Sequence, residues 1–307
     1  MRIYIAGHTG LVGSALTRAV DSGSGLTWIG KPHKDLDLTD RKAVFEYVSS
    51  EKPDAMIIAA AKVGGIMAHA TYPVEFLSQN IQISTNLIDA AHEANIERLV
   101  FLGSSCAYPK LSPQPIREEY LLEGPLESTN SAYAIAKIAG IKLVDAYRQQ
   151  FKRNWNSVMP TNLYGQNDNY ERNNSHVIPA LIRKFHEAEI DGSEMVSLWG
   201  SGSVLREFLH ADDLAAAILT ILEKDAKSAL VNVGSGEELT IAELAGLVAN
   251  TVGYSHQISW DRINPDGTPR KLLDSAKVRS LGWKPKISLP EGLRSAYIDF
   301  KLQSLRD

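Results

Sequence analysis

Short apolar runs alternate with amphipathic stretches through the first half of the chain. Runs of apolar residues, which favour strands, occur at residues 2–6, 26–29, 55–60, 99–102 and 157–159. Stretches with the apolar spacing of helices occupy residues 11–22, 41–50, 80–95 and 131–151. This alternation predicts a Rossmann-type doubly wound parallel sheet of the α/β class, with helices on both faces. Ligands of such sheets bind at the carboxyl ends of the strands.

The pattern changes after about residue 165. Residues 166–176 are polar and aperiodic, and residues 256–290 are rich in Pro, Gly and Trp. Helical stretches at 212–223 and 241–252 are expected to return to the main sheet. We therefore expect a cofactor-binding domain from residues 1–165 and about 205–252, and a smaller substrate-binding lobe from about 166–204 and 253–307.

The composition is that of a globular protein, with 44% hydrophobic and 22% charged residues among 307. The net charge of −4 argues against a general nucleic-acid binder. The start MRIYIAGHTG does not resemble a signal peptide, and no stretch approaches the roughly 20 apolar residues of a membrane span. One cysteine cannot form an intramolecular disulfide. We expect a cytoplasmic protein with no membrane partner, no nucleic-acid partner and no metal site.

A glycine loop with the spacing G-x-x-G-x-x-G joins the first predicted strand to the first predicted helix. Glycine permits a tight turn, lets the backbone approach a pyrophosphate, and lets the helix pack closely on the strand. A glycine triplet alone is weak evidence, but the strand–turn–helix setting at residues 2–22 makes it specific. The loop predicts a dinucleotide site formed by Gly7, His8, Thr9, Gly10, Leu11, Val12 and Gly13.

The residues after the second predicted strand indicate which dinucleotide binds. An NAD site usually has Asp or Glu there, to bind the ribose 2′-hydroxyl. This chain has Gly30-Lys31-Pro32-His33-Lys34 instead. Basic side chains suit a 2′-phosphate, so Lys31 and His33 predict NADP as the cofactor. The alternative is a solvated basic loop without a ligand.

Tyr133 and Lys137 are four residues apart, on one face of a predicted helix. We expect the Lys137 ammonium to lower the pKa of Tyr133 toward the working pH. Tyr133 can then give a proton to a carbonyl oxygen while hydride reaches the carbon. This pair occurs by chance in many helices, but Ser104 follows the fourth predicted strand and can bond to the same carbonyl. Together with the glycine loop, these residues predict a reductase.

Long segments resemble the extended short-chain dehydrogenases/reductases, and within them the GDP-4-keto-6-deoxymannose epimerase/reductases. The matching segments are GHTGLVGSA, AAAKVGGI (59–66), FLGSSCAYPK (101–110), YAIAKIAGIKL (133–143), VMPTNLYG (158–165), NSHVIPAL (174–181), REFLHADDLA (206–215), PDGTPRKLLD and LGW. The resemblance therefore covers nearly the whole chain. It implies an NADPH-dependent enzyme that inverts two carbons beside the ketone of a GDP-4-keto-6-deoxy sugar, then reduces the ketone to give GDP-L-fucose.

The resemblance also implies roles for single residues. Ser104, Tyr133 and Lys137 match the reductase triad, and Cys106 and His176 match the epimerase pair. A thiol and an imidazole are plausible partners for proton transfer near neutral pH. Further implied cofactor contacts are Leu102, Gly103, Ser105, Lys137, Pro160, Thr161, Asn162, Leu163 and His176. The implied substrate contacts are Asn162, Lys184, Trp199, Arg206, Asp266 and Lys271.

Thr9 in the glycine loop departs from the family pattern. Some relatives carry Arg where this chain has Thr9, so the NADP preference depends on Lys31, His33 and Lys34.

Family members pair two helices into a four-helix dimer interface, which implies a homodimer. The matching helices carry apolar residues on more than one face, namely Ile81, Ile83, Leu87, Ile138, Ile141 and Leu143. The alternative is that both faces are buried within the monomer.

Three other functions fit parts of the sequence. The same chemistry on a 3-deoxy sugar would give GDP-L-colitose. A heptose reductase without epimerase activity would be expected to lack one epimerase residue, whereas Cys106 and His176 are both present. A dinucleotide-sensing regulator without turnover would be expected to lose Tyr133 or Lys137, and both are intact.

Overall fold

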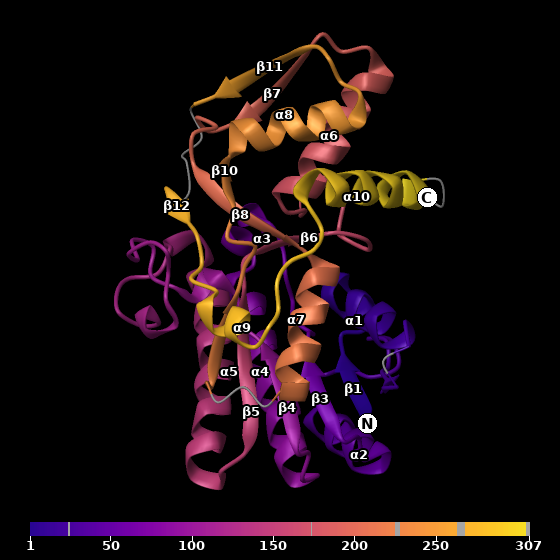
Figure 1. Cartoon of the computed structure of the whole chain (residues 1–307), viewed down its shortest axis with the longest axis vertical. Helices are drawn as coiled ribbons and strands as arrows, with labels where there is room; N and C mark the ends of the chain where they lie inside the picture. The colour runs from indigo at the N-terminus through magenta and orange to yellow at the C-terminus, as the bar shows by residue number, and fades with distance from the viewer. Residues whose placement is uncertain (24, 173, 225–227, 263–267, 305–307) are drawn as a thin grey trace.

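A parallel sheet forms the lower half of the molecule (Figure 1). The computed structural model describes residues 1–23, 25–172, 174–224, 228–262 and 268–304, and within them this sheet has six strands in the order β2-β1-β3-β4-β5-β9. The strands are β1 (Arg2–Ala6), β2 (Thr27–Ile29), β3 (Ala55–Ile58), β4 (Arg98–Leu102), β5 (Asn154–Pro160) and β9 (Leu230–Val233). The predicted Rossmann-type α/β fold is confirmed, and β9 is a strand that the sequence analysis did not predict.

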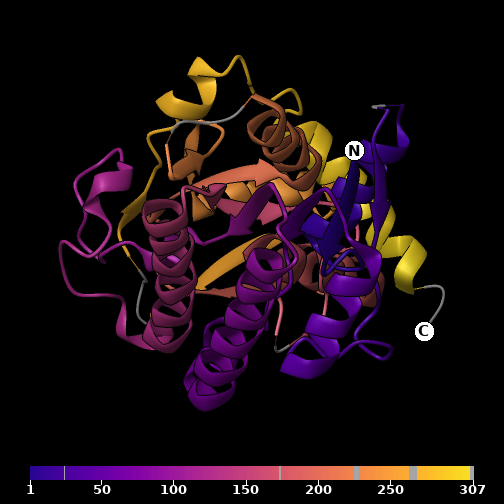
Figure 2. The same ribbon diagram turned by 90° about the horizontal axis from the view of Figure 1, so that it is seen from below.

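Helices cover both faces of this sheet. Helices α1 and α7 pack together on one face, and α2, α4 and α5 cover the other (Figure 2). Their bounds are α1 (Leu11–Asp21), α2 (Arg41–Glu51), α4 (Pro73–Glu93), α5 (Ser131–Phe151) and α7 (Ala211–Lys224). Successive side chains of a strand point to opposite faces. Accordingly Ile3 and Ile5 of β1 enter the first core and Tyr4 enters the second, so both faces of the strand are buried.

The remaining elements lie mainly above the carboxyl ends of the strands, as an upper lobe (Figure 1). Tyr164, Phe185 and Leu244 are fully or almost fully buried in its core. Helix α8 packs against α6 and α10 in this lobe, although we expected residues 241–252 to return to the main sheet. The strands are β6 (Asn162–Tyr164), β7 (Met195–Trp199), β8 (Leu205–His210), β10 (Glu238–Thr240), β11 (Gln257–Asp261) and β12 (Arg270–Lys271). The helices are α6 (Val177–Asp191), α8 (Ile241–Val252) and α10 (Leu289–Ser304).

Shorter elements lie within the connections between the main strands and helices. They are α3 (Ile66–Thr71), α9 (Ala276–Ser280) and the 3-10 helices η1 (Ser105–Ala107), η2 (Glu118–Tyr120) and η3 (Ser128–Asn130). The chain passes from β1 to β2 on one side, and β3 then pairs with β1 on its other side. The gap between the ends of β1 and β3 is therefore the switch point where such folds bind nucleotides. None of the helices in the described part of the chain is both long and apolar enough to span a membrane.

Candidate active site

The glycine loop after β1 has the shape of a dinucleotide cradle. Gly7 has a φ of +86°, and a Cβ on it would lie 2.7 Å from the backbone nitrogen of Ala60. A Cβ on Gly13 would lie 1.9 Å from the carbonyl oxygen of Gly7. Both positions therefore require glycine. Helix α1 begins after Gly10 without a side-chain cap, and a helix N-terminus of this kind attracts a phosphate. The loop fits the group that the sequence predicts.

The predicted 2′-phosphate contacts lie in an exposed loop after β2. Lys31, His33 and Lys34 are all solvent accessible. The Lys31 ammonium lies 5.5 Å from the centre of the Tyr47 ring, and His33 lines a surface groove of about 400 Å³. Their positions beside the sheet edge suit a cofactor contact, and that role stays a prediction.

Tyr133 and Lys137 are buried on the inner side of α5, as their spacing predicts. The Lys137 Nζ atom donates a hydrogen bond of 2.7 Å to the carbonyl oxygen of Leu102, at the end of β4. This Nζ atom also lies 5.8 Å from the centre of the Tyr133 ring. Ser104 caps η1 from the position before it, and its hydroxyl accepts a hydrogen bond of 3.2 Å from the backbone N–H of Cys106. The structure thus places the three residues of the proposed reductase triad around the end of β4.

The expected effect of Lys137 on Tyr133 is wrong. Burial and the nearby Cys106 raise the pKa of Tyr133 above its ordinary value, although a side-chain hydrogen bond with Ser104 lowers it in part. Burial also lowers the pKa of Lys137 to about 7, because a buried ammonium lacks hydration. Tyr133 therefore keeps its proton at neutral pH. A protonated phenol is the form that a proton donor to a ketone needs.

The proposed epimerase residues approach the same place from two other elements. Cys106 is half-buried in η1, and Lys271 of β12 has its Nζ atom 3.8 Å from the Cys106 sulfur. His176 is the residue that precedes α6. The residue is solvent exposed, although many protein atoms lie near its ring and desolvate it in part. These surroundings lower the pKa of His176, which makes its protonated form a stronger acid.

His69 is a residue of this site that the sequence analysis missed. Its ring on α3 lies 5.1 Å from the Tyr133 ring and 4.1 Å from the Phe76 ring, centre to centre. Burial lowers the pKa of His69, and the charge of His176 lowers it further. His69 therefore contacts the proposed proton donor and lies near enough to the proposed epimerase histidine for their charges to interact. Periodicity carries no signal for such a contact.

The turn at residues 63–65 (VGG) packs against the loop that precedes His176. The side chain of Asn80 accepts a hydrogen bond of 2.8 Å from the backbone N–H of Lys62 and donates one of 3.0 Å to its carbonyl oxygen. A Cβ on Gly65 would lie 3.0 Å from the carbonyl oxygen of Ser175. This close approach explains glycine at position 65 and sets the position of the residue that follows Ser175, which is His176.

The other predicted cofactor contacts lie along the ends of β4 and β5. Gly103 donates its backbone N–H to the carbonyl oxygen of Val158 at 2.8 Å. The side chains of Thr161 and Asn162 donate to the carbonyl oxygen of Glu207 at 3.1 and 2.8 Å. The remaining ones are Leu102 at the end of β4, the buried Ser105 in η1, Pro160 at the end of β5 and Leu163 in β6. All of them lie at or just after the carboxyl ends of these strands, where ligands of such sheets bind.

The predicted substrate contacts come from the upper lobe. Arg206 of β8 and Lys271 of β12 are paired residues of neighbouring strands, so their side chains share a face. Lys184 donates a hydrogen bond of 2.6 Å to the carbonyl oxygen of Ser197. Trp199 ends β7 with 64% of its surface exposed. Asp266 lies outside the described residues.

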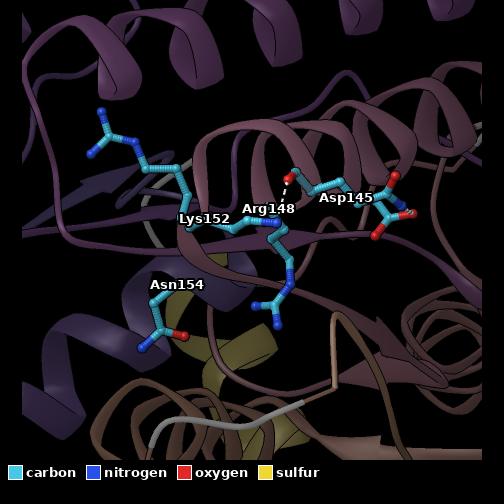
Figure 3. Close-up of a pocket in the computed structure, with 6 residues that line it drawn as sticks. Asp145, Arg148, Lys152 and Asn154 are labelled. Atoms are coloured by element: carbon cyan, nitrogen blue, oxygen red, sulfur yellow. Dashed lines mark hydrogen bonds between the residues drawn. The ribbon is translucent and has the colours of Figure 1, made fainter.

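A cavity at the opposite end of the sheet is a separate feature (Figure 3). It has a volume of about 460 Å³ and lies at the end of α5 and the start of β5. Its lining consists of Asp145, Arg148, Gln149, Lys152, Arg153 and Asn154. None of the predicted site residues lines it, and it faces away from the carboxyl ends of the strands. The glycine loop and the tyrosine–lysine pair remain the candidate site.

Comparisons with known proteins show the family to which this chain belongs. Residues 3–234 match the model of the NAD dependent epimerase/dehydratase family. GDP-L-fucose synthase 1 of Arabidopsis thaliana is 54% identical over 298 residues, which cover 96% of this chain and 92% of that protein. GDP-L-fucose synthase of Escherichia coli (strain K12) is 49% identical over 305 residues, covering 96% and 95%. A crystal structure of a GDP-L-fucose synthetase from Naegleria fowleri bound to NADP is 26% identical, with a TM-score of 0.90 and coverage of 99% and 93%. The chain belongs to the NAD dependent epimerase/dehydratase family.

Proposed function

We propose that this enzyme converts GDP-4-keto-6-deoxy-D-mannose to GDP-L-fucose, by inversion at C3 and C5 and NADPH-dependent reduction at C4. One observation carries the proposal: Ser104, Tyr133 and Lys137 lie at the same strand end as Cys106, and His69, whose ring contacts Tyr133, interacts electrostatically with His176. A reductase alone has no use for the thiol and imidazole. The relatives named GDP-L-fucose synthase support the choice of substrate.

Reduction uses the residues around the end of β4. Bound NADPH supplies the hydride for C4. Tyr133 gives its proton to the ketone oxygen, and the Ser104 hydroxyl donates a hydrogen bond to the same oxygen. The raised pKa of Tyr133 keeps the phenol protonated until the transfer. Lys137 donates a hydrogen bond to the carbonyl oxygen of Leu102 and so holds α5 against the end of β4.

Epimerisation uses Cys106 and His176. A C–H bond beside a ketone is acidic, because the negative charge left on the carbon is delocalised onto the ketone oxygen. Cys106 takes this proton, and His176 returns one to the carbon. The lowered pKa of His176 makes its imidazolium a stronger acid, and it also means that a smaller share of the rings carries the proton near neutral pH.

We propose that the upper lobe binds the nucleotide part of the substrate. Lys184, Arg206 and Lys271 provide cations for the diphosphate, and Asn162 contacts the sugar. The exposed Trp199 offers a flat surface for the guanine base. We further propose that residues 1–165, with α7 and β9 from the range 205–252, hold the cofactor. A cytoplasmic location stays a prediction.

Incubation with GDP-4-keto-6-deoxymannose and NADPH, with NMR of the product, tests the function. The proposal predicts GDP-L-fucose with deuterium at C3 and C5 when the solvent is D₂O. A product without inversion would contradict it. Faster turnover of the 3-deoxy analogue would identify a GDP-L-colitose synthase instead.

A double charge reversal tests the choice of cofactor. Lys31→Glu with Lys34→Glu should weaken NADPH at least about tenfold while leaving NADH nearly unchanged, because only NADPH carries the 2′-phosphate. Lys284→Glu with Lys286→Glu changes the net charge equally in another exposed loop and serves as the control. Dissociation constants from fluorescence titration decide. Equal losses for both cofactors would show that Lys31 and Lys34 do not contact the phosphate.

We propose that the enzyme is a homodimer through α4 and α5. Leu87, Ile138 and Ile141 are buried within one chain, where α4 and α5 pack together. Ile135 of α5 is 47% exposed and offers apolar surface for a second copy. Light scattering at micromolar concentration should therefore give a dimer mass, and Ile135→Arg should give a monomer.

Ile190→Arg is the matched control for this test, because Ile190 is 70% exposed on α6 of the other lobe. It should leave the dimer intact. A monomeric mass for the unmodified chain would contradict the proposed assembly.

A further inference from the structure

The ammonium group of a lysine contacts the sulfur of the chain's single cysteine. The Nζ atom of Lys271 is 3.8 Å from the Cys106 sulfur, although 165 residues separate them in sequence. Neighbouring cations have carboxylate partners: Arg270 pairs with Glu238, Lys277 with Glu118 and Lys110 with Glu127. Among the described residues, no ion pair links Lys271 to a carboxylate.

The backbone around Lys271 is fixed on both sides, so the contact is built into the fold. The carbonyl of Leu272 accepts from the N–H of Ile116 at 2.7 Å, and the N–H of Leu272 donates to the side chain of Gln114 at 2.9 Å. Leu273 donates its N–H to the fully buried carboxylate of Glu207 at 3.1 Å. Arg270 turns to Glu238, so alternation along the strand directs Lys271 to the opposite side, where Cys106 lies.

We propose that Lys271 holds Cys106 as a thiolate and thereby makes it the base of the epimerase pair. This role rests on the proposed function and adds to the diphosphate contact expected of Lys271. A thiol accepts a proton from carbon only after losing its own, and an ammonium beside the sulfur favours the ionised form. In a half-buried site this attraction is stronger than in water, because less solvent screens it.

The proton balance of the step is closed. The Cys106 thiolate takes a proton from C3 or C5, which leaves a thiol and an enolate. The enolate carbon takes a proton from the imidazolium of His176, which leaves a neutral imidazole. The thiol proton then passes to His176 through solvent, which restores the thiolate and the imidazolium. Lys271 keeps its charge throughout and compensates the thiolate at the start of each cycle.

Alkylation by iodoacetamide measures the thiolate directly, because Cys106 is the only cysteine and each molecule gains one adduct. At about pH 7, Lys271→Met should react about tenfold more slowly than the unmodified enzyme, since the loss of a close opposite charge favours the thiol. Lys271→Arg should keep most of the rate. Lys110→Met is the control, because Lys110 lies four residues from Cys106 but pairs with Glu127 at 2.9 Å.

A second condition separates ionisation from access. Among the residues that the structure describes, the titratable groups that face Cys106 are Lys271 from β12 and Tyr133 from α5. At about pH 10 an ordinary thiol ionises without help from a cation, so Lys271→Met should there approach the rate of the unmodified enzyme. A Lys271→Met variant that reacts as fast as the unmodified enzyme at the lower pH overturns the proposal. A variant that stays slow at both pH values has lost access to the sulfur and overturns it too.

These measurements need no substrate, so they are independent of the proposed function. If the enzyme forms no GDP-L-fucose but its alkylation rate depends on Lys271, the proposed function is refuted and the thiolate assignment stands. If it forms GDP-L-fucose but its alkylation rate does not depend on Lys271, only the thiolate assignment is refuted. In the active enzyme, deuterium uptake at C3 and C5 should fall in Lys271→Met and return in Lys271→Arg.

Discussion

Tyr133→Phe is expected to reduce ketone reduction by about 10²- to 10⁴-fold, the usual contribution of a positioned proton donor. The change removes the phenolic proton and keeps the ring, so the contacts of Tyr133 with His69 and Phe76 should survive. The fold and NADPH binding should therefore be retained. The rate of NADPH consumption in the presence of the keto sugar measures the loss.

Tyr147→Phe is a matched control on the same helix. The Tyr147 hydroxyl donates to Asp89 at 2.8 Å, far from the site, so its removal should lower stability slightly and leave turnover near normal. A Tyr133→Phe enzyme with normal turnover would remove Tyr133 from the mechanism.

Local signals were sufficient for most of the sheet and for α5. The buried run at residues 2–6 and the helix at 131–151 have the predicted bounds, because each apolar pattern is strong and its ends are marked. Helix α4 begins at Pro73 rather than at residue 80. Its inner face includes the buried polar residues Asn80 and Ser84, which interrupt the apolar pattern while bonding to backbone carbonyls nearby.

Features that depend on tertiary contacts were not predictable. The apolar side of α8 fits either half of the molecule equally well, and only the structure shows that it packs on α6 and α10. Strand β9 has just four residues, of which Asn232 is polar; its backbone and side chain bond to Glu118, Ile116 and Tyr108. The sequence likewise contains no local sign that a strand distant in sequence brings Lys271 to Cys106.

In the candidate site, too, features with a local sequence signal were predictable and features that depend on tertiary contacts were not. The glycine loop and the tyrosine–lysine spacing are local, and the structure places them as predicted. The direction of the Tyr133 pKa shift depends on how completely the phenol is buried, which the helix pattern does not reveal. His69 enters the site only because α3 and α5 come together in space.

Cys106→Ser and His176→Asn should separate epimerisation from reduction. A serine hydroxyl ionises far less readily than a thiol, so Cys106→Ser keeps the size of the residue but fails as a base. His176→Asn keeps a polar side chain and removes the titrating ring. Each change should slow deuterium uptake at C3 and C5 by about 10²- to 10⁴-fold, the range for loss of an acid or base. Reduction should continue slowly, because Tyr133 and Ser104 are untouched.

The most direct test compares deuterium content and configuration of the product in D₂O for Cys106→Ser, His176→Asn and Tyr133→Phe. The account predicts that the first two variants yield a reduced sugar with little or only partial inversion and little deuterium at C3 and C5. It predicts the reverse for Tyr133→Phe, with deuterium uptake in the keto sugar and almost no reduction. If Cys106→Ser and His176→Asn both left the exchange and the product configuration unchanged, the enzyme would be a simple ketone reductase and the account would be contradicted.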